Sequence, residues 1–317
     1  MKVELEKTRK VLSWDRKEYT FLKDEKIYSF FYFEGKHYGI LYFVSEISIL
    51  IERNYKMEQN IYDNDEFFKG YQSKRGQLSA NDLIEIPELF RLIGDVNNLS
   101  VLDLGCGTGG HDRKLIDLGA KKVLGIDLSN NMINEARKNT NTDKIEYRVM
   151  SMNNIDTIDE KFDLVISSLA IHYIEDYDSL CKKVYNLLNT GGRFIFSYGH
   201  PMDSCAILDD YSNNYVEINN KKYYLISDYN NEGKRISHWY VDGVETYHRN
   251  ISHLINGLID AGFKLEHVTE SYATDEVIKL NPKFIDQKDH SYFIFFKCKK
   301  WYVHNTKTKN ILILERK

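Results

Sequence analysis

Three glycines at a fixed spacing are the first candidates for binding chemistry in this sequence. Gly105, Gly107 and Gly110 satisfy the pattern G-x-G-x-x-G, directly after the apolar run VLDLG (101–105) and within GGHDRKLIDLGA (109–120), which has helical periodicity. Glycines suit such a turn because they adopt positive φ and lack a Cβ that would hold a ligand away from the backbone. A strand, this turn and a helix N-terminus together predict a site for a nucleotide-like ligand.

Two carboxylates indicate which ligand this is. Asp103 lies two residues before the first glycine, and Asp127 lies at the end of the next apolar run, VLGIDL (123–128). A carboxylate at position 103 would repel the pyrophosphate of a dinucleotide and attract the ammonium or sulfonium of S-adenosylmethionine. Asp127 is placed to accept hydrogen bonds from both ribose hydroxyls, a contact that the two cofactor classes share. The pair favours S-adenosylmethionine; the alternative is that both are polar residues at strand ends.

Two histidines are the catalytic candidates. Methyl transfer needs a base where the acceptor holds its proton tightly, and histidine suits this role because its pKa lies near the working pH. His172 in AIHYIED and His200 in YGHP both follow predicted strands, at the edge where open α/β sheets bind ligands. We favour His200 as the base, with His172 and Tyr173 shaping the pocket. The alternative is that both histidines are hydrogen-bonded structural residues.

Alternating strands and helices are expected to position these residues. Helical spacing of apolar residues predicts amphipathic helices between the strands, as over residues 178–188. Parallel neighbours need such crossover connections, so the pattern predicts an α/β fold with a doubly wound, mostly parallel seven-stranded sheet. The predicted strands are residues 101–105, 123–128, 145–150, 162–169, 193–199, 264–271 and 291–300.

Three segments are expected to be additions to a catalytic domain at residues 57–300. Residues 1–56 form an N-terminal extension, in which alternating aromatics around Gly35 predict a small hairpin. Residues 200–246 break the strand–helix rhythm and are expected to insert after the fifth strand and cover the substrate. Residues 301–317 form a basic C-terminal tail. The candidates for an aromatic substrate pocket in and beside the insertion are Trp239, Tyr240, Tyr247 and His248, for which packing within the insertion is the alternative.

Composition excludes several classes of function. Hydrophobic residues make up 42% of the 317 and charged residues 28%, as in ordinary globular proteins. The net charge is −4 overall and −12 over residues 57–296, which argues against nucleic acid as a partner. No apolar run is long enough for a membrane span, and the N-terminus lacks the apolar stretch of a signal peptide. The four cysteines show no disulfide or metal-ligand spacing, so we expect a metal-independent, cytoplasmic protein.

Four sequence blocks resemble one family in order and spacing. VLDLGCGTGG, VLGIDLS, FDLVISSLAIHYIED and GGRFIFSYGHP resemble the class I S-adenosylmethionine-dependent methyltransferases, within them the bacterial small-molecule group called type 11, over roughly residues 60–300. The resemblance implies a Rossmann-like methyltransferase fold and in-line methyl transfer to an oxygen or nitrogen of a small-molecule acceptor. The Asn/Asp-Pro-Pro-Tyr block of amino methylases of bases and glutamine is replaced here by Ser-Ser-Leu-Ala, which lowers the expectation for that class.

The resemblance also implies which residues bind the cofactor. Around the methionine end and the ribose these are Gly105, Cys106, Gly107, Thr108, Asp103 facing the amino group and Asp127 on the ribose. Around the adenine they are Leu128 and Met132, with Ser151 and Met152 where many relatives have an aspartate, and Ser168 is assigned to the cofactor site as well. Tyr71 and Arg75, in YQSKR (71–75), are candidates for the methionine carboxylate, and an exposed Arg75 without a role is the alternative.

Two other classes of function also fit parts of this sequence. A nicotinamide-dependent oxidoreductase fits the glycines but not Asp103. A non-catalytic, cofactor-binding regulatory module fits both features and would be recognised by cofactor affinity without a methyl acceptor. No motif in the insertion indicates the acceptor, and nothing in the sequence indicates the oligomeric state.

Overall fold

The chain divides into two compact units, Met1–Gln59 and Asn60–Lys317. The computed structural model describes residues 17–23, 26–33, 36–38, 58–73, 76, 78–207, 215–219 and 221–301. In the first unit, β1 (Lys17–Lys23), β2 (Lys26–Phe33) and β3 (Lys36–Tyr38) form an antiparallel sheet in that order. The β2–β3 hairpin agrees with the expectation around Gly35, and β1 is a strand that the pattern did not predict. The part of that expectation at residues 40–42, and the basic tail beyond Trp301, lie outside the described residues.

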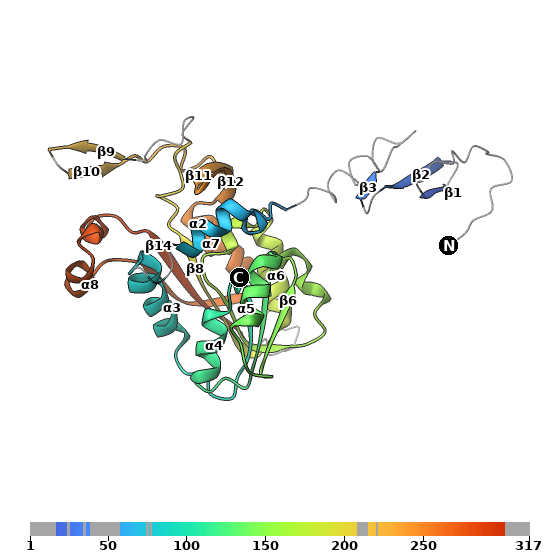
Figure 1. The fold of residues 1–317 in the computed structure, drawn as a ribbon, viewed down its shortest axis with the longest axis horizontal. Helices are drawn as coiled ribbons and strands as arrows, with labels where there is room; N and C mark the ends of the chain where they lie inside the picture. Colours follow the sequence, from blue (N-terminus) through green and yellow to red (C-terminus); the bar gives the residue numbers. More distant parts are fainter. Residues whose placement is uncertain are drawn as a thin grey trace, which may run out of the picture. The chain divides into compact units, whose positions relative to one another are not determined.

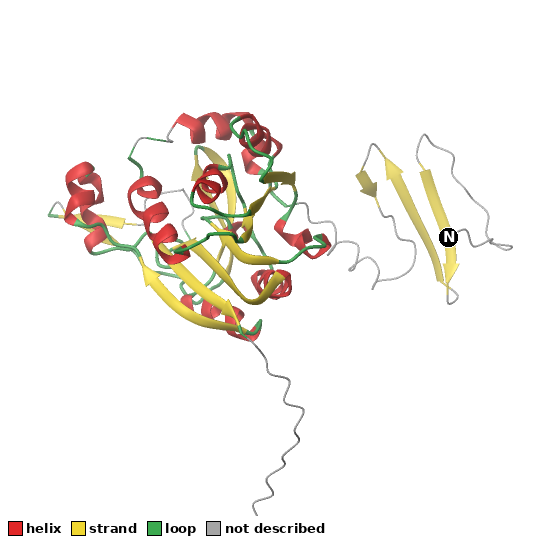
Figure 2. Cartoon of the chain, turned by 90° about the horizontal axis from the view of Figure 1, so that it is seen from below, coloured by secondary structure: helices red, strands yellow, loops and turns green. Residues whose placement is uncertain are grey.

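A seven-stranded sheet forms the centre of the second unit, with helices on both sides (Figure 1 and Figure 2). Its strand order is β13-β14-β8-β7-β4-β5-β6. The pairs from β8 to β6 are parallel, whereas β14 is antiparallel to both β8 and β13. The predicted doubly wound, mostly parallel fold is confirmed. The strands are β4 (Ser100–Leu104), β5 (Lys122–Asp127), β6 (Ile145–Val149), β7 (Phe162–Ser167), β8 (Leu188–Gly199), β13 (Phe263–Glu270) and β14 (Phe293–Lys300).

Each face of this sheet has its own buried core. Successive residues of a strand point to opposite faces, so Val101 of β4 packs with one group of helices and Leu102 with the other. The first group of helices is α3 (Ile86–Ile93), α4 (Gly110–Asp117) and α5 (Asn130–Lys138), which pack on the sheet through Leu89, Leu115 and Ile133. The second group is α6 (Tyr177–Leu187) and α7 (Ile251–Asp260), which pack on the other face through Leu180 and Leu254.

The chain before β4 is helical but broken into short pieces. A 3₁₀ turn, η1 (Ile61–Asp63), precedes α2 (Asp65–Ser73), and a π-helical turn, η2 (Asn81–Glu85), leads directly into α3. Pro87 lies in the first turn of α3, where its missing N–H costs no helical hydrogen bond. The π-helical turn and α3 therefore follow one another without an intervening loop.

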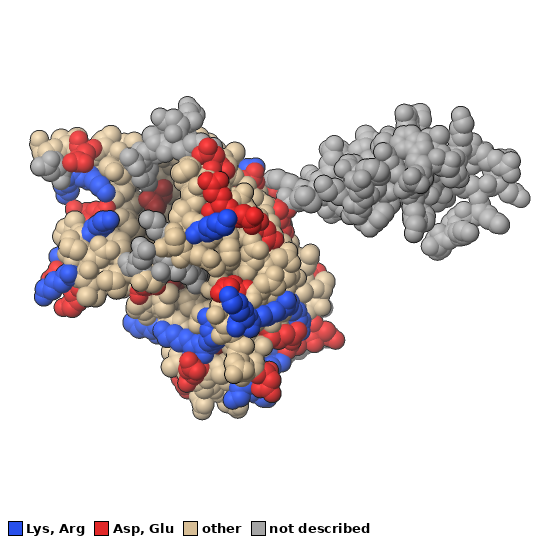
Figure 3. Space-filling view, viewed as in Figure 1, with Lys and Arg blue, Asp and Glu red and all other residues tan. Residues whose placement is uncertain are grey.

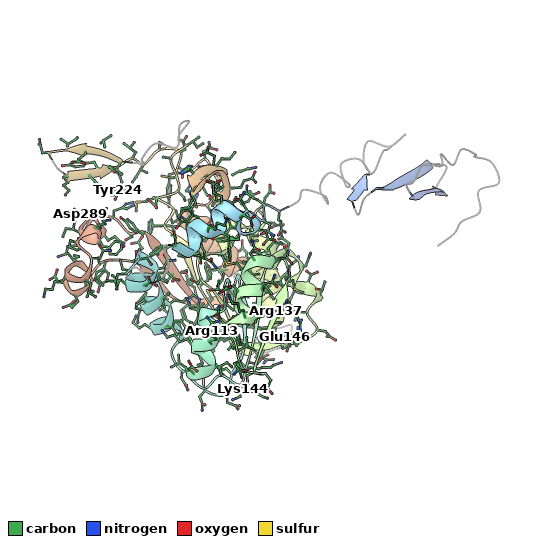
Figure 4. All side chains as sticks on the ribbon, viewed as in Figure 1. Arg113, Arg137, Lys144, Glu146, Tyr224 and Asp289 are labelled. Atoms are coloured by element: carbon green, nitrogen blue, oxygen red, sulfur yellow. The ribbon has the colours of Figure 1, made fainter. Side chains whose placement is uncertain are left out.

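The insertion after β8 contains two hairpins. They are β9 (Tyr215–Ile218) with β10 (Lys221–Tyr224), and β11 (Gly233–Trp239) with β12 (Val241–His248). The first hairpin lies near α8 (Asp275–Leu280) and η5 (Pro282–Lys288), and Figure 4 labels Tyr224 beside Asp289. The Tyr224 ring stacks on His290 with centroids 3.6 Å apart, and its hydroxyl donates to Asp286 Oδ2 at 2.7 Å. These contacts attach the insertion to the domain.

Basic side chains gather over α4 and α5 on the face drawn in Figure 3, where Figure 4 labels Arg113 and Arg137. Both arginines brace the backbone: Arg113 Nη1 donates to Thr108 O at 2.9 Å, and Arg137 Nη2 donates to Tyr147 O at 2.7 Å.

Within the described part of the chain, the helices are too short or too polar to cross a bilayer.

Candidate active site

A glycine turn connects β4 to α4, as the sequence predicts. Gly105 and Gly107 have φ of 78° and 54°, in the left-handed region that favours glycine. The N–H groups of Gly105 and Cys106 both donate to Ile126 O, at 2.8 and 2.9 Å, which ties the turn to the end of β5. A Cβ on Gly105 would lie 2.4 Å from Ala170 Cβ, so the turn and the segment after β7 approach closely. Position 105 therefore requires glycine, because any side chain would collide with Ala170.

Asp127 braces the same turn from the carboxyl end of β5. Its Oδ2 accepts from Gly107 N at 3.0 Å, and its Oδ1 accepts from Ser129 N at 2.9 Å. Burial raises the pKa of Asp127 to about 6, although these backbone hydrogen bonds oppose the rise. The carboxylate is thus held rigidly beside the turn, with lone pairs left for further donors.

Asp103 is fully buried in β4 and faces a second carboxyl, Asp112 of α4. Burial, followed by the charge of Asp112, raises the pKa of Asp103 well above its usual range, and burial also raises the pKa of Asp112. The two groups can hydrogen-bond to one another when a proton lies between them, and the Tyr147 side chain and the charge of Arg113 oppose the rise in the pKa of Asp112. Our expectation treated Asp103 as a lone anion; the structure makes it half of a pair.

The residues expected around an adenine lie at the ends of β5 and β6. Leu128 O accepts from Asn60 Nδ2 at 3.2 Å, and Ser151 Oγ caps η3 (Met152–Thr157) by accepting from Asn153 N at 2.9 Å. Met152 is close to the turn, with its Cε 3.1 Å from the position of a Cβ on Gly105. Met132 is 2% exposed and packs inside the domain, so its side chain offers little surface to a ligand.

Asp63 of η1 joins the segment before the sheet to the N-terminus of α5. Its Oδ1 accepts from Ser129 Oγ at 2.6 Å and from Asn131 N at 2.9 Å, and its Oδ2 accepts from Asn130 N at 3.2 Å. Burial raises the pKa of Asp63, but the hydrogen bonds from residues 129–131 outweigh it and the net shift is downward. A carboxylate at a helix N-terminus is stabilising, so this contact holds η1 and α2 next to the end of β5.

An aromatic cluster brings together three of the predicted residues. Tyr62 of η1 lies edge to face with Tyr71, Tyr173 and Trp239, at centroid distances of 5.3, 6.0 and 6.5 Å. The hydroxyls of Tyr62 and Tyr173 are 3.2 Å apart, and burial raises the pKa of both tyrosines. Phe67 of α2 completes the cluster, 4.9 Å from Tyr62. The cluster therefore joins α2, the segment after β7 and the β11–β12 hairpin. Arg75 lies outside the described residues.

The candidate histidines have different surroundings. His200 is buried, its Nε2 lies 2.9 Å from Glu270 Oε1, and its Nδ1 accepts from Met202 N at 3.2 Å. His248 is also buried, between Ser204 Oγ at 3.1 Å and Tyr229 O at 2.9 Å, inside the insertion. His172 packs against Tyr173, and burial, then Arg249, lowers its pKa to about 4. Within the described residues, its Nδ1 has no hydrogen-bond partner.

Comparison with known proteins identifies the family. Residues 102–196 match a family model described as a methyltransferase domain. The crystal structure of an S-adenosylmethionine-dependent methyltransferase from Mesorhizobium loti is 33% identical, with a TM-score of 0.63, covering 68% of this chain and 97% of that one. The chain belongs to the class I S-adenosylmethionine-dependent methyltransferases. A candidate methyltransferase from Listeria monocytogenes gives a similar match, at 35% identity and a TM-score of 0.63, with 69% and 97% covered.

Curated relatives of this methyltransferase differ in what they methylate. An uncharacterised protein of Haemophilus influenzae is 33% identical over 251 residues, 76% of this chain and 97% of its own length. A malonyl-[acyl-carrier protein] O-methyltransferase of Hamiltonella defensa is 30% identical over 109 residues, which are 34% of this chain and 41% of that enzyme. Phosphoethanolamine N-methyltransferase 1 of Zea mays is 32% identical over 133 residues, which are 41% of this chain and 25% of that enzyme. The family assignment removes the nicotinamide alternative.

The described residues fit the donor of this methyltransferase family. A cationic ligand suits a site beside the buried carboxyls Asp103 and Asp112, and the glycine turn there lacks a Cβ that would obstruct a ligand. Sequence reasoning missed Asp63 and Asp112. Asp112 is three residues before the buried Leu115, on the same side of α4, and this helical spacing is the signal that could have revealed it. No local pattern marks Asp63, because its partners follow it by 66 to 68 residues.

Proposed function

We propose that this methyltransferase transfers a methyl group from S-adenosylmethionine to an oxygen or nitrogen of a small-molecule acceptor, in the cytoplasm. The main support for the donor site is the glycine turn, whose N–H groups donate to Ile126 O and to Asp127, directly after the strand that contains the buried Asp103. S-adenosylmethionine supplies a methyl group on a sulfonium, which departs as a neutral thioether. The protein then has to align the acceptor and exclude water.

For the donor, we assign Asp127 to the ribose and Asp103 to the ammonium. Asp127 is fixed by two backbone N–H groups, so it need not reorganise on binding. Asp103 lies where the turn leaves β4, and its closeness to the second buried carboxyl, Asp112, favours a cationic ligand beside it. Tyr71 stays our candidate near the methionine carboxylate, since its ring is part of the cluster that lies over this end of the sheet.

For the acceptor, we assign the region between the aromatic cluster and the segment after β7. Tyr173 and Trp239 both lie edge to face with Tyr62, so an acceptor bound beside them would be shielded from water by rings from three elements. We propose His172 as the base, if the acceptor needs one, because its Nδ1 has no hydrogen-bond partner among the described residues and is therefore available to an acceptor. The hydrogen bonds on both ring nitrogens of His200 favour a supporting role for that residue.

A titration and a labelling experiment test this function. S-adenosylmethionine and S-adenosylhomocysteine are titrated into the purified full chain by calorimetry, with NADH as the control ligand. Radiolabelled S-adenosylmethionine is then incubated with the protein and a metabolite extract, and labelled products are identified by mass. We expect binding of both adenosyl ligands and a labelled small molecule. NADH binding without adenosyl binding would contradict the donor assignment, and adenosyl binding without any labelled product would favour a regulatory module.

A further inference from the structure

Glu85 is a buried carboxylic acid for which the donor site described above gives no role. It ends the π-helical turn η2 and is 0% exposed, at the carboxyl ends of β7 and β8. π-Helical turns are rare and occur often at functional sites, and the carboxyl ends of parallel strands are where open α/β sheets bind ligands. A carboxylic acid is seldom placed in such a position without a partner.

The hydrogen bonds of Glu85 lead to the segment opposite the glycine turn. Its Oε1 accepts from Ser168 Oγ at 2.9 Å and from Ser197 Oγ at 2.5 Å. Ser197 Oγ in turn accepts from Leu169 N at 3.0 Å, and Leu169 has a φ of 48°, which is strained for a residue with a branched side chain. The next residue, Ala170, is the one that approaches Gly105 most closely. Glu85 therefore holds residues 168–170 in the conformation that shapes the donor cleft.

The second carboxyl oxygen of Glu85 is left without a counterpart. Oε2 is buried and, among the residues that the structure describes, accepts no hydrogen bond and forms no ion pair. Burial raises the pKa of Glu85 to about 7, although the two serine hydroxyls oppose the rise. The nearby charge of Glu85 also contributes to the raised pKa of Asp103. Other titratable or charged groups on the elements around Glu85 include Asp82 on η2, the Glu88–Arg91 pair on α3, Asp103 on β4, His111 and Asp112 on α4, His172 on η4 (Ile171–Tyr173), Arg193 on β8, Lys297 on β14 and His200 after β8.

We propose that Glu85 is a positioning residue for donor binding: S-adenosylmethionine binds to the form in which Glu85 is ionised and holds residues 168–170, so that binding releases a proton to solvent. Two features support this. An ionised carboxylate accepts the two serine hydroxyls more strongly than a neutral acid does, and a cationic ligand stabilises an anion in a buried, acidic site. The inference rests on the proposed donor site and adds to it a residue outside the glycine turn.

The experiment measures donor affinity and proton release against pH. S-adenosylmethionine is titrated into the wild type and into Glu85→Gln at pH 6, in phosphate and in bis-Tris, and at pH 8, in phosphate and in Tris. The different ionisation enthalpies of the paired buffers reveal released protons. A group with a pKa of about 7 is roughly ten times more ionised at pH 8 than at pH 6, so we expect an about tenfold lower apparent Kd for the wild type at pH 8. For Glu85→Gln, whose amide oxygen can still accept from a serine, we expect this pH dependence and the proton release to diminish together.

Three comparisons make the result decisive. Glu88→Gln, a partly exposed carboxylate in the first turn of α3, is the matched control and should behave as the wild type. Glu85→Asp keeps the charge and should retain proton release with weaker binding; circular dichroism checks that each variant folds. The inference is overturned if Glu85→Gln keeps the wild-type pH dependence, if it weakens binding equally at both pH values, or if Asp112→Asn alone abolishes proton release. Absence of any binding by the wild type would instead contradict the donor site itself.

Discussion

Replacing Asp127 by alanine should weaken the binding of S-adenosylhomocysteine by a predictable amount. The carboxylate is fixed by the N–H groups of Gly107 at 3.0 Å and Ser129 at 2.9 Å, and we assign its remaining lone pairs to the ribose hydroxyls. Loss of a hydrogen bond to a charged group costs about 1 to 3 kcal/mol, and about 1.4 kcal/mol corresponds to a tenfold change in Kd. We therefore expect a Kd about 5 to 150 times higher by calorimetry at pH 7.5.

A ligand change separates the ribose contact from a general loosening of the turn. The wild type should bind a 2′,3′-dideoxy analogue of S-adenosylhomocysteine about as weakly as Asp127→Ala binds the normal ligand, and the variant should no longer distinguish the two ligands. Asp117→Ala, an exposed aspartate of α4, is the control and should leave Kd unchanged. A Kd for Asp127→Ala within twofold of the wild type, or undiminished discrimination against the analogue, would refute the ribose assignment.

Three further changes test other parts of the site. Gly105→Ala should abolish donor binding while the protein stays folded, because φ is 78° and the new Cβ would meet Ala170 at 2.4 Å; micromolar binding by a folded variant would contradict this. Asp63→Ala should speed donor dissociation in stopped-flow measurements and expose the 58–73 segment to protease, since it removes the hydrogen bonds to residues 129–131; unchanged rates would show that this contact does not gate the cleft. Once an acceptor is known, His172→Phe should lower kcat about 100-fold or more with donor Kd unchanged, whereas wild-type turnover would exclude a base at this position.

Local sequence patterns predicted most of the fold. The alternation of apolar runs with helical spacing is a property of neighbouring residues, and it predicted the seven strands and the helices between them. The glycine turn was also predictable, because a strand, three glycines and a helix start occur within a few consecutive residues. The strand β1 pairs with β2 beside the predicted hairpin and was not predicted, because the alternating aromatics that flank Gly35 begin only at Tyr28.

The sequence by itself determined the donor class and the residues of the glycine turn, because those residues are contiguous and their types are dictated by backbone conformation and charge. The tertiary structure decided what surrounds them. It placed Asp112 next to Asp103 and Asp63 at the N-terminus of α5. It also brought Glu85 within hydrogen-bonding distance of Ser168, just after β7, and Ser197 of β8. These partners are separated in sequence by between 9 and 112 residues, so burial and pairing, which set the protonation of each carboxyl, exist only once the elements pack together.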